Sequence, residues 1–381
     1  MAYTTINKSS LQMDTKLYTG TGSELTISGI GFQPDFTWLK NRSSAQHHQL
    51  YDVGRGAGKV MYSNLTNAEG TVTEQLKSWT SDGYVLGTDG SLNTNSENFV
   101  SWNWKANGAG SSNTDGTITS TVSANPSAGF SIAKYTGTGS NASFGHGLGV
   151  MPDIVIIKRM DTADNWIVMS GGSSDSSPYQ IFGSYDYYLP LSSTGAGSGS
   201  LATGDNRAST NSSTTYFNIG TDAVVNASGG TYIAYCFANI SGYSKMGRYS
   251  GSGSTNGAFV YTGFKPSFIL TKRIDSTAHW YHWDNKRIGF NPSNYILFPA
   301  QNAAEDAGAA ERNDFLSNGF KFRHADSDHN GDAGDYFYMA FGQTMVGTND
   351  GTQSNLYDES FVAKRGLTFT VNADGELTTT V

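Results

Sequence analysis

The chain of 381 residues has one cysteine and few charged side chains. A single cysteine excludes an intramolecular disulfide framework. Charged residues make up 15% of the sequence, against roughly 25% in typical globular domains, so charge repulsion does not oppose folding. Lysine and arginine number 24 against 32 aspartates and glutamates, and this acidic balance offers no basic footprint for a phosphate backbone. We therefore expect no nucleic-acid partner.

Long apolar runs are also missing. No stretch approaches the roughly 20 apolar residues that span a bilayer, so we expect no membrane insertion. The opening sequence MAYTTINKSS lacks the basic and apolar segments of a signal peptide, which predicts synthesis in the cytoplasm. The chain does contain 46 glycines and 13% aromatic residues. This combination indicates a turn-rich fold that packs with rings.

Three landmarks recur along the chain. The first is a glycine-rich motif, which begins at Tyr18, Tyr135 and Tyr249. The second is a proline followed six residues later by a lysine, at Pro34 and Lys40, Pro152 and Lys158, and Pro266 and Lys272. The third is an alternating aromatic segment, at residues 99–105, 232–238 and 336–343. Recurrence of this kind indicates three copies of one structural unit.

The landmarks set the predicted domain boundaries. We place three β-sandwich repeats at residues 1–108, 129–243 and 244–346. Residues 109–128 are polar and of low complexity, which is typical of a linker. The remaining residues, 347–381, end in two alternating segments around Asn372–Gly375, and this pattern predicts a C-terminal β-hairpin.

The period of the third landmark predicts strands. Every second residue is large and apolar, as in Val100, Trp102 and Trp104. A period of two is typical of a strand with one packed face, and we expect the opposite face to be only partly covered. Sustained helical periodicity is missing. The sequence thus predicts an all-β fold of three tandem jelly-roll-like β-sandwich repeats plus a C-terminal β-hairpin.

One segment matches the start of a calcium-binding loop. Asp326, Asp328 and Asn330 are spaced as D-x-[DN]-x-[DN]-G, and Asp332 adds another carboxylate. The twelfth position, where a bidentate glutamate closes such a site, is Phe337. A hairpin turn rich in Asp and Asn explains the same residues, because both types bond their own backbone. Calcium and a structural turn are both open; no other cofactor is expected.

An aromatic segment offers a candidate binding surface. Trp280, Tyr281 and Trp283 could stack on a sugar or a partner protein, as could the tyrosines of residues 185–188. Packing of the same rings in the core is the alternative.

Candidate catalytic residues are not brought together by the sequence. Glu69 and Glu305 occupy corresponding loops without an obvious partner. Cys236 takes a position where the other units have small residues, and no histidine lies near it in sequence. We expect no enzymatic activity.

The first unit contains the series FQPDFTWLKNR, HHQLYDVGRG, SNLTNAEG, SDGYVLG and SWNWKANG. This series resembles a domain of unknown function that recurs in structural and tail-fibre proteins of tailed bacteriophages, especially marine ones. The resemblance covers residues 17–108 and includes a D-x-x-RG element. The other two units lose that element, so any specific role of it would fall to Asp52, Arg55 and Gly56.

The resemblance implies a structural protein of the virion, exposed on the particle surface as a tail fibre or similar appendage that serves assembly and host attachment. A capsid decoration (head cement) protein is one alternative, and a lectin-like glycan-binding module is another. The expected partners are other virion proteins and a host-surface glycan. Isolated sandwiches leave edge strands unpaired, which favours a homo-oligomer, and we expect a trimer.

Overall fold

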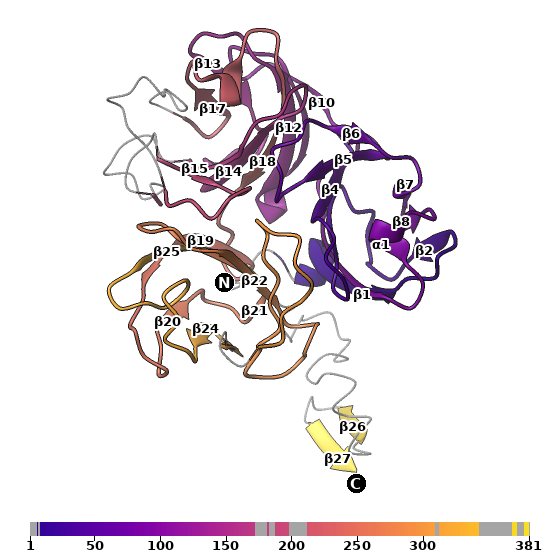
Figure 1. The fold of residues 1–381 in the computed structure, drawn as a ribbon, viewed down its shortest axis with the longest axis vertical. Helices are drawn as coiled ribbons and strands as arrows, with labels where there is room; N and C mark the ends of the chain where they lie inside the picture. Colours follow the sequence, from indigo (N-terminus) through magenta and orange to yellow (C-terminus); the bar gives the residue numbers. More distant parts are fainter. Residues whose placement is uncertain are drawn as a thin grey trace. The chain divides into compact units, whose positions relative to one another are not determined.

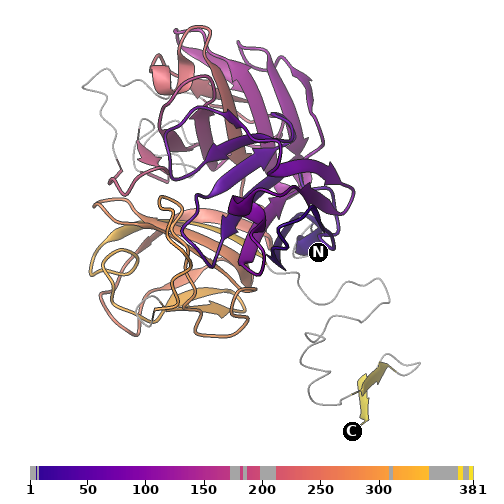
Figure 2. The same cartoon turned by 45° about the vertical axis from the view of Figure 1, so that its right-hand side comes forward.

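The structure is a computed structural model, almost all β, that describes residues 6, 8–171, 181–182, 187–197, 212–308 and 312–342 and the backbone of 368–371 and 377–380. The chain divides into two compact units, residues 1–343 and 344–381. Antiparallel sheets form the first unit, in three lobes that are visible in Figure 1 and, from another side, in Figure 2. The predicted all-β class is confirmed.

Lobe 1 has a larger sheet of order β1-β9-β3-β4-β5-β6 and a smaller sheet of order β2-β8-β7. Its strands are β1 (Met13–Thr19), β2 (Leu25–Ile27), β3 (Phe36–Asn41), β4 (Gln49–Asp52), β5 (Lys59–Tyr62), β6 (Gly70–Thr71), β7 (Leu76–Thr80), β8 (Gly83–Leu86) and β9 (Asn98–Trp104). Its short helices are η1 (Ser9–Leu11) and α1 (Gly90–Asn93).

Lobe 2 has a larger sheet of order β10-β11-β12-β18-β14-β15-β16 and a smaller pair, β13-β17. Its strands are β10 (Ser111–Asn113), β11 (Ser120–Asn125), β12 (Phe130–Thr136), β13 (Ala142–Gly145), β14 (Ile154–Arg159), β15 (Trp166–Ser170), β16 (Tyr188–Pro190), β17 (Tyr216–Ile219) and β18 (Thr231–Phe237). Its short helices are η2 (Pro126–Ala128) and α2 (Ala223–Asn226).

Lobe 3 has a larger sheet of order β19-β25-β21-β22 and a smaller sheet of order β20-β24-β23. Its strands are β19 (Ser244–Ser250), β20 (Phe259–Tyr261), β21 (Pro266–Arg273), β22 (Trp280–Asp284), β23 (Asn313–Leu316), β24 (Gly319–Phe322) and β25 (Asp335–Gly342).

The three larger sheets share one strand order. β1-β9-β3-β4 in lobe 1 corresponds to β12-β18-β14-β15 in lobe 2 and to β19-β25-β21-β22 in lobe 3. In each lobe the second strand of this order contains the third landmark. Its neighbour on one side leads into the glycine-rich motif, and its neighbour on the other side lies at the landmark proline. The sequence landmarks therefore mark a recurring strand order, and the jelly-roll description of each unit stays a prediction.

The segment interpreted as a polar linker, residues 109–128, forms structure. It contains β10, β11 and η2, and it extends the lobe 2 sheet, in which β11 pairs with β12 and β10 forms the edge. Ile118 and Val122 are buried in the lobe 2 core. These two apolar residues are spaced four apart among polar ones, too sparsely for the sequence pattern to indicate strands.

Both faces of each central strand are buried, so the expectation of a partly covered face was wrong. One face of β9, β18 and β25 packs into a core shared by the three lobes, with Trp102, Tyr235 and Met339 as examples. The opposite face of β18 and β25 packs into the separate core of its own lobe, where Cys236 and Ala340 lie. The landmark strands thus hold the lobes together as well as each lobe's two sheets.

The second unit contains an antiparallel strand pair, β26 (Thr368–Val371) and β27 (Leu377–Thr380). The predicted C-terminal hairpin is confirmed in these two strands. The turn expected at Asn372–Gly375 lies outside the described residues.

Candidate functional site

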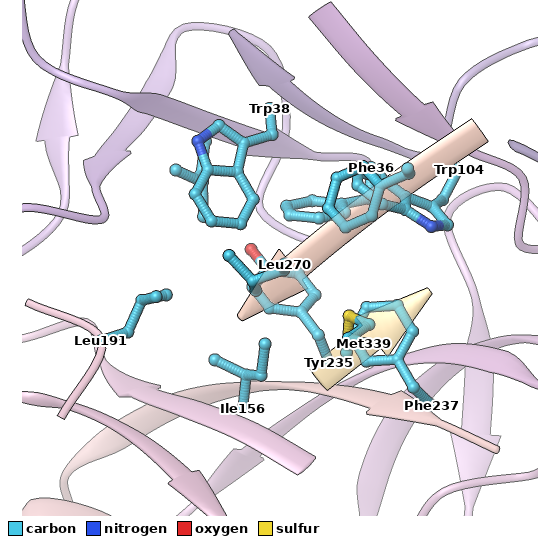
Figure 3. A pocket seen from close by; sticks show the side chains of 11 residues that line it. Phe36, Trp38, Trp104, Ile156, Leu191, Tyr235, Phe237, Leu270 and Met339 are labelled. Atoms are coloured by element: carbon cyan, nitrogen blue, oxygen red, sulfur yellow. The ribbon is translucent and has the colours of Figure 1, made fainter. Parts of the chain in front are cut away.

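The place where the three lobes meet is the most distinctive feature of the described structure. Figure 3 shows the side chains that converge there, and each lobe contributes some of them. They are Phe36, Trp38, Leu50, Trp104, Ile156, Leu191, Tyr235, Phe237, Phe268, Leu270 and Met339. The cavity they enclose measures about 10 Å³, which is room for one water molecule at most. The centre is therefore a packed apolar core and leaves no room for an organic ligand.

Three equivalent main-chain hydrogen bonds join the lobes in a cycle. The N–H of Glu69 in lobe 1 donates to the carbonyl of Met160 in lobe 2, over 2.9 Å. The N–H of Gly197 in lobe 2 donates to Ile274 in lobe 3, over 2.8 Å. The N–H of Glu305 in lobe 3 donates to Arg42 in lobe 1, over 2.9 Å.

Each acceptor follows a landmark lysine by two residues. The interface is therefore head-to-tail and closes after three lobes, as in a cyclic trimer.

A buried ion pair lies at the contact between lobes 1 and 2. Arg55 Nε donates to Asp52 Oδ2 over 2.5 Å, and both side chains are almost fully buried. Tyr235 of lobe 2 donates its hydroxyl to the same carboxylate oxygen over 2.7 Å. Arg55 also donates to the carbonyls of Leu50 and Lys59. Burial lowers the pKa of Arg55 and Asp52 raises it, and the net effect is an increase, so the guanidinium keeps its charge.

The same arrangement recurs at the contact between lobes 3 and 1. Arg287 Nε donates to Asp284 Oδ2 over 2.6 Å, and its other nitrogens donate to Glu305 and the carbonyl of His282. Trp102 of lobe 1 donates its indole N–H to Asp284 over 3.1 Å. The sequence assigned any role of the D-x-x-RG element to the first unit alone. Lobe 3 lacks the glycine, but Asp284 and Arg287 form the same Asp–Arg pair, so the role extends to lobe 3, while lobe 2 has Ser170 in place of the aspartate.

Glu69 and Glu305, for which the sequence indicated no partner, each lie close to basic side chains. Glu305 forms a two-pronged ion pair with Arg42 of lobe 1, with N–O distances of 3.0 and 2.7 Å, in addition to its bond with Arg287. Glu69 lies 3.6 Å from both Arg55 and Lys59. These partners are distant in sequence or in another lobe, so local pattern could not reveal them.

The contact between lobes 2 and 3 has different chemistry. The register places Ser170 of β15 where Asp52 and Asp284 lie in the other lobes, and Met339 of β25 where Tyr235 and Trp102 lie. The indole of Trp280 donates to the carbonyl of Pro190 over 2.9 Å at this contact, as Trp166 of lobe 2 donates to the carbonyl of Tyr62 in lobe 1, so the missing Asp–Arg pair is what distinguishes it.

The three landmark lysines are buried at the outer end of the shared core. Lys40, Lys158 and Lys272 are 0% exposed, and each Nζ donates to the carbonyl of the next residue over 2.6 to 2.7 Å. Burial lowers the pKa of Lys40 to about 7 and those of Lys158 and Lys272 to about 8. The strand positions of these residues were predicted, but their burial was not.

A buried asparagine in each lobe holds the glycine-rich motif. Asn93, Asn226 and Asn330 are 0% exposed. Each accepts an N–H from the motif through its side-chain oxygen, from Thr21, Thr138 and Ser252. Each donates its side-chain NH2 to a motif carbonyl, of Ser23, Ser140 and Ser254. The motif glycines Gly22, Gly139 and Gly253 have positive φ angles, which explains the choice of glycine at the bend.

The residue four positions before each of these asparagines is an aspartate. Asp89, Asp222 and Asp326 each accept the N–H of the residue two positions later, over 2.7 to 2.9 Å. The D-x-x-x-N spacing precedes the third landmark in all three units, and this shared position is the signal that could have revealed these contacts.

The residues of the candidate calcium loop have partners within the protein. Asp326 caps the turn, Asn330 holds the glycine-rich motif, and Asp328 accepts the N–H of His279 over 3.1 Å. Asp332 is exposed. In the part of the chain that the structure describes, no group of three or more His, Cys, Asp or Glu side chains could hold a metal ion. The calcium site stays a prediction without support from the geometry.

The three rings proposed for ligand stacking are buried. Trp280 is 0% exposed and packs in the shared core, while Tyr281 and Trp283, at 3% and 0%, stack on each other in the lobe 3 core. Such rings cannot contact a ligand from solvent, so this assignment was wrong and core packing is the correct alternative. Of the tyrosines in residues 185–188, Tyr185 lies outside the described residues, and Tyr187 and Tyr188 are partly buried.

Among the residues described, no helix has the length and apolarity that a membrane crossing requires. None of the curated proteins matches the chain. The family model that does match spans residues 8–344 and so covers all three lobes, where the resemblance was expected over residues 17–108. The chain therefore belongs to the family described as a domain of unknown function, DUF7483.

Proposed function

We propose that the chain is a structural protein of a tailed-bacteriophage virion, exposed on the particle surface as a tail fibre or a similar appendage. The observation that supports this best is the cyclic contact between the lobes. Its charged and aromatic side chains, such as Arg55, Arg287 and Trp102, contact other parts of the same chain. A block held together in this way keeps its outer faces available for neighbours and host.

The buried ion pairs at the contacts between the lobes favour a structural role over catalysis. Two Asp–Arg pairs are fully hydrogen-bonded and buried, and removal of one member of such a pair is strongly destabilising. Residues with this role fix the relative placement of the lobes. A protein that connects the particle to its host requires lobes that keep their relative positions.

Immunogold labelling of purified phage particles that encode the chain tests the location. Gold on the tail or its appendages supports the proposal. Gold confined to the head would replace it with the alternative of a capsid decoration protein. Particles that carry no label, with the protein detected by the same antibody in the infected-cell lysate, would contradict a virion role.

Assembly is part of the proposal, with other virion proteins as partners and a homotrimer as the oligomer. The smaller sheets end in edge strands such as β20, and exposed edges favour association. Light scattering of the purified chain across micromolar concentrations gives its mass. A trimer mass supports this part, and a monomer throughout would contradict it.

A further inference from the structure

The outer face of the smaller lobe 3 sheet carries two exposed rings. Phe259 and Tyr261 lie two residues apart on the edge strand β20 and are 47% and 55% exposed. Val260 between them is buried in the lobe 3 core. The alternation places both rings on the same side of the sheet, away from that core.

The corresponding strands of lobes 1 and 2 show that the fold does not need these rings. Buried Val260 pairs with Phe320, as Ile27 pairs with Tyr84 and Phe144 with Phe217. The residues that flank the buried position are Thr26 and Ser28 in lobe 1, Ser143 and Gly145 in lobe 2, and Phe259 and Tyr261 in lobe 3. Small residues satisfy the architecture at these positions twice, so the two rings require an explanation outside folding.

Cations surround the rings. Lys321 lies directly opposite Phe259 in the strand register, where lobe 1 has Val85 opposite Thr26. The ammonium group of Lys245 lies 5.1 Å from the centre of the Tyr261 ring and donates to the Tyr261 carbonyl over 3.0 Å. Arg323 is 39% exposed and is paired with Asp314, which itself lies opposite Lys321. The four charged side chains named here carry three positive charges and one negative charge, although the whole chain has a net charge of −8.

We propose that this face, formed by Phe259, Tyr261, Lys245 and Lys321, binds an acidic polysaccharide. The flat rings suit the apolar C–H faces of sugar rings, and the lysines suit the carboxylate or sulfate groups of the same polymer. A neutral sugar would leave the cations without a counter-charge, and an acidic peptide would not need two flat rings in a row. The inference rests on the proposed function only in assigning the polysaccharide to a host surface.

Isothermal titration of the purified chain measures this binding. The probes are alginate for uronate groups, dextran sulfate for sulfate groups, dextran as the neutral polymer and polyglutamate as an acid without sugar. The ring variant is F259T/Y261S, which gives lobe 3 the residues of lobe 1. The cation variant is K321V, and V150S, at an exposed apolar position of lobe 2, is the matched control.

The chain and V150S should bind alginate or dextran sulfate, and whichever binds identifies the acidic group. The ring variant should bind at least tenfold more weakly with its melting temperature unchanged, and K321V should also bind more weakly. Unaltered affinity in the ring variant, equal binding to polyglutamate, or no binding to either acidic polysaccharide would overturn the inference. Loss of self-association in the ring variant would instead assign the face to contact with a second copy of the chain. None of these results depends on where the protein lies in a particle.

Discussion

Tyr235 on β18 donates its hydroxyl to Oδ2 of Asp52 on β4, 183 residues away and in another lobe. The same carboxylate oxygen accepts from Arg55. One buried acidic group thus links a strand of lobe 2 to the turn that follows β4. Loss of this contact should lower the free energy of unfolding of both lobes, since the two lobes share one core.

The variant Y235F should therefore destabilise the chain. It leaves the ring in place but removes one hydrogen bond to a buried carboxylate, which costs about 1–3 kcal/mol of the free energy of unfolding. Urea denaturation followed by tryptophan fluorescence measures this. The matched control is Y243F, because the Tyr243 hydroxyl is buried and has no hydrogen-bond partner among the described residues. Equal stability of the two variants would refute the role of the contact.

Replacement of Arg287 should be more damaging than replacement of the whole pair. R287M leaves the buried Asp284 carboxyl group without its cationic partner, at a cost of about 3–5 kcal/mol. The double variant D284L/R287M removes both charges and should recover part of that loss. Thermal unfolding of the two variants beside the wild type tests the order. A double variant less stable than R287M would show that the carboxylate tolerates isolation.

The asparagine of each lobe should be a strong stability determinant. N226A removes the acceptor for Thr138 N–H and the donor to the carbonyls of Ser140 and Gly220, and we expect a loss of about 2–4 kcal/mol. N226D tests the same contacts, because a carboxylate keeps the acceptor but not the donor. Chemical denaturation that gives N226D the stability of the wild type would contradict the clamp.

Calcium removal tests the remaining interpretation of the loop in lobe 3. Since Asp326 and Asn330 have internal partners that match those of the other two lobes, EDTA should leave the melting temperature unchanged. N330A should lower the melting temperature equally with EDTA and with millimolar calcium. A rise of several degrees on adding calcium to the wild type would restore the metal site.

The buried lysines predict a pH dependence. Desolvation lowers the pKa of Lys158 and Lys272 to about 8 from 10.5, so in this range the unfolded chain binds more protons than the folded chain. Stability should consequently rise with pH from about 7 to about 10, where tyrosine ionisation in the unfolded chain begins to reverse it. Denaturant midpoints at several pH values measure the slope. K158M/K272M should flatten the slope, and an unchanged slope would contradict the assignment.

The landmarks of the sequence were sufficient to predict the strands but not to predict what packs against their faces. A period of two in Val100, Trp102 and Trp104 shows that one face of β9 is apolar, yet it is silent on whether that face packs on a second sheet or on another lobe. The opposite face contains Ser101 and Asn103, which are also buried. Polar residues there bond within the sheet and to Tyr84, so polarity gave a false indication of exposure.

Candidate site residues fared worse because spacing describes only neighbours in sequence. The pattern from Asp326 to Asn330 fits a calcium loop when it is read once, and a cap and clamp when it is compared with Asp89 to Asn93. Trp280 and Trp283 are three residues apart and therefore lie on opposite faces of β22. Both are buried because the two faces are covered by different cores, which the sequence of one strand does not reveal.

The cyclic contact between the lobes is formed within one polypeptide, and this has an evolutionary consequence. A ring of three identical chains must have the same residues at every contact between subunits and on every outer face. Tandem fusion removes that constraint. The contact between lobes 1 and 2 can therefore keep Asp52 with Tyr235, while the contact between lobes 2 and 3 has Ser170 and Met339 at the same positions. The outer face of lobe 3 can likewise carry residues for recognition while the corresponding faces of lobes 1 and 2 keep small residues.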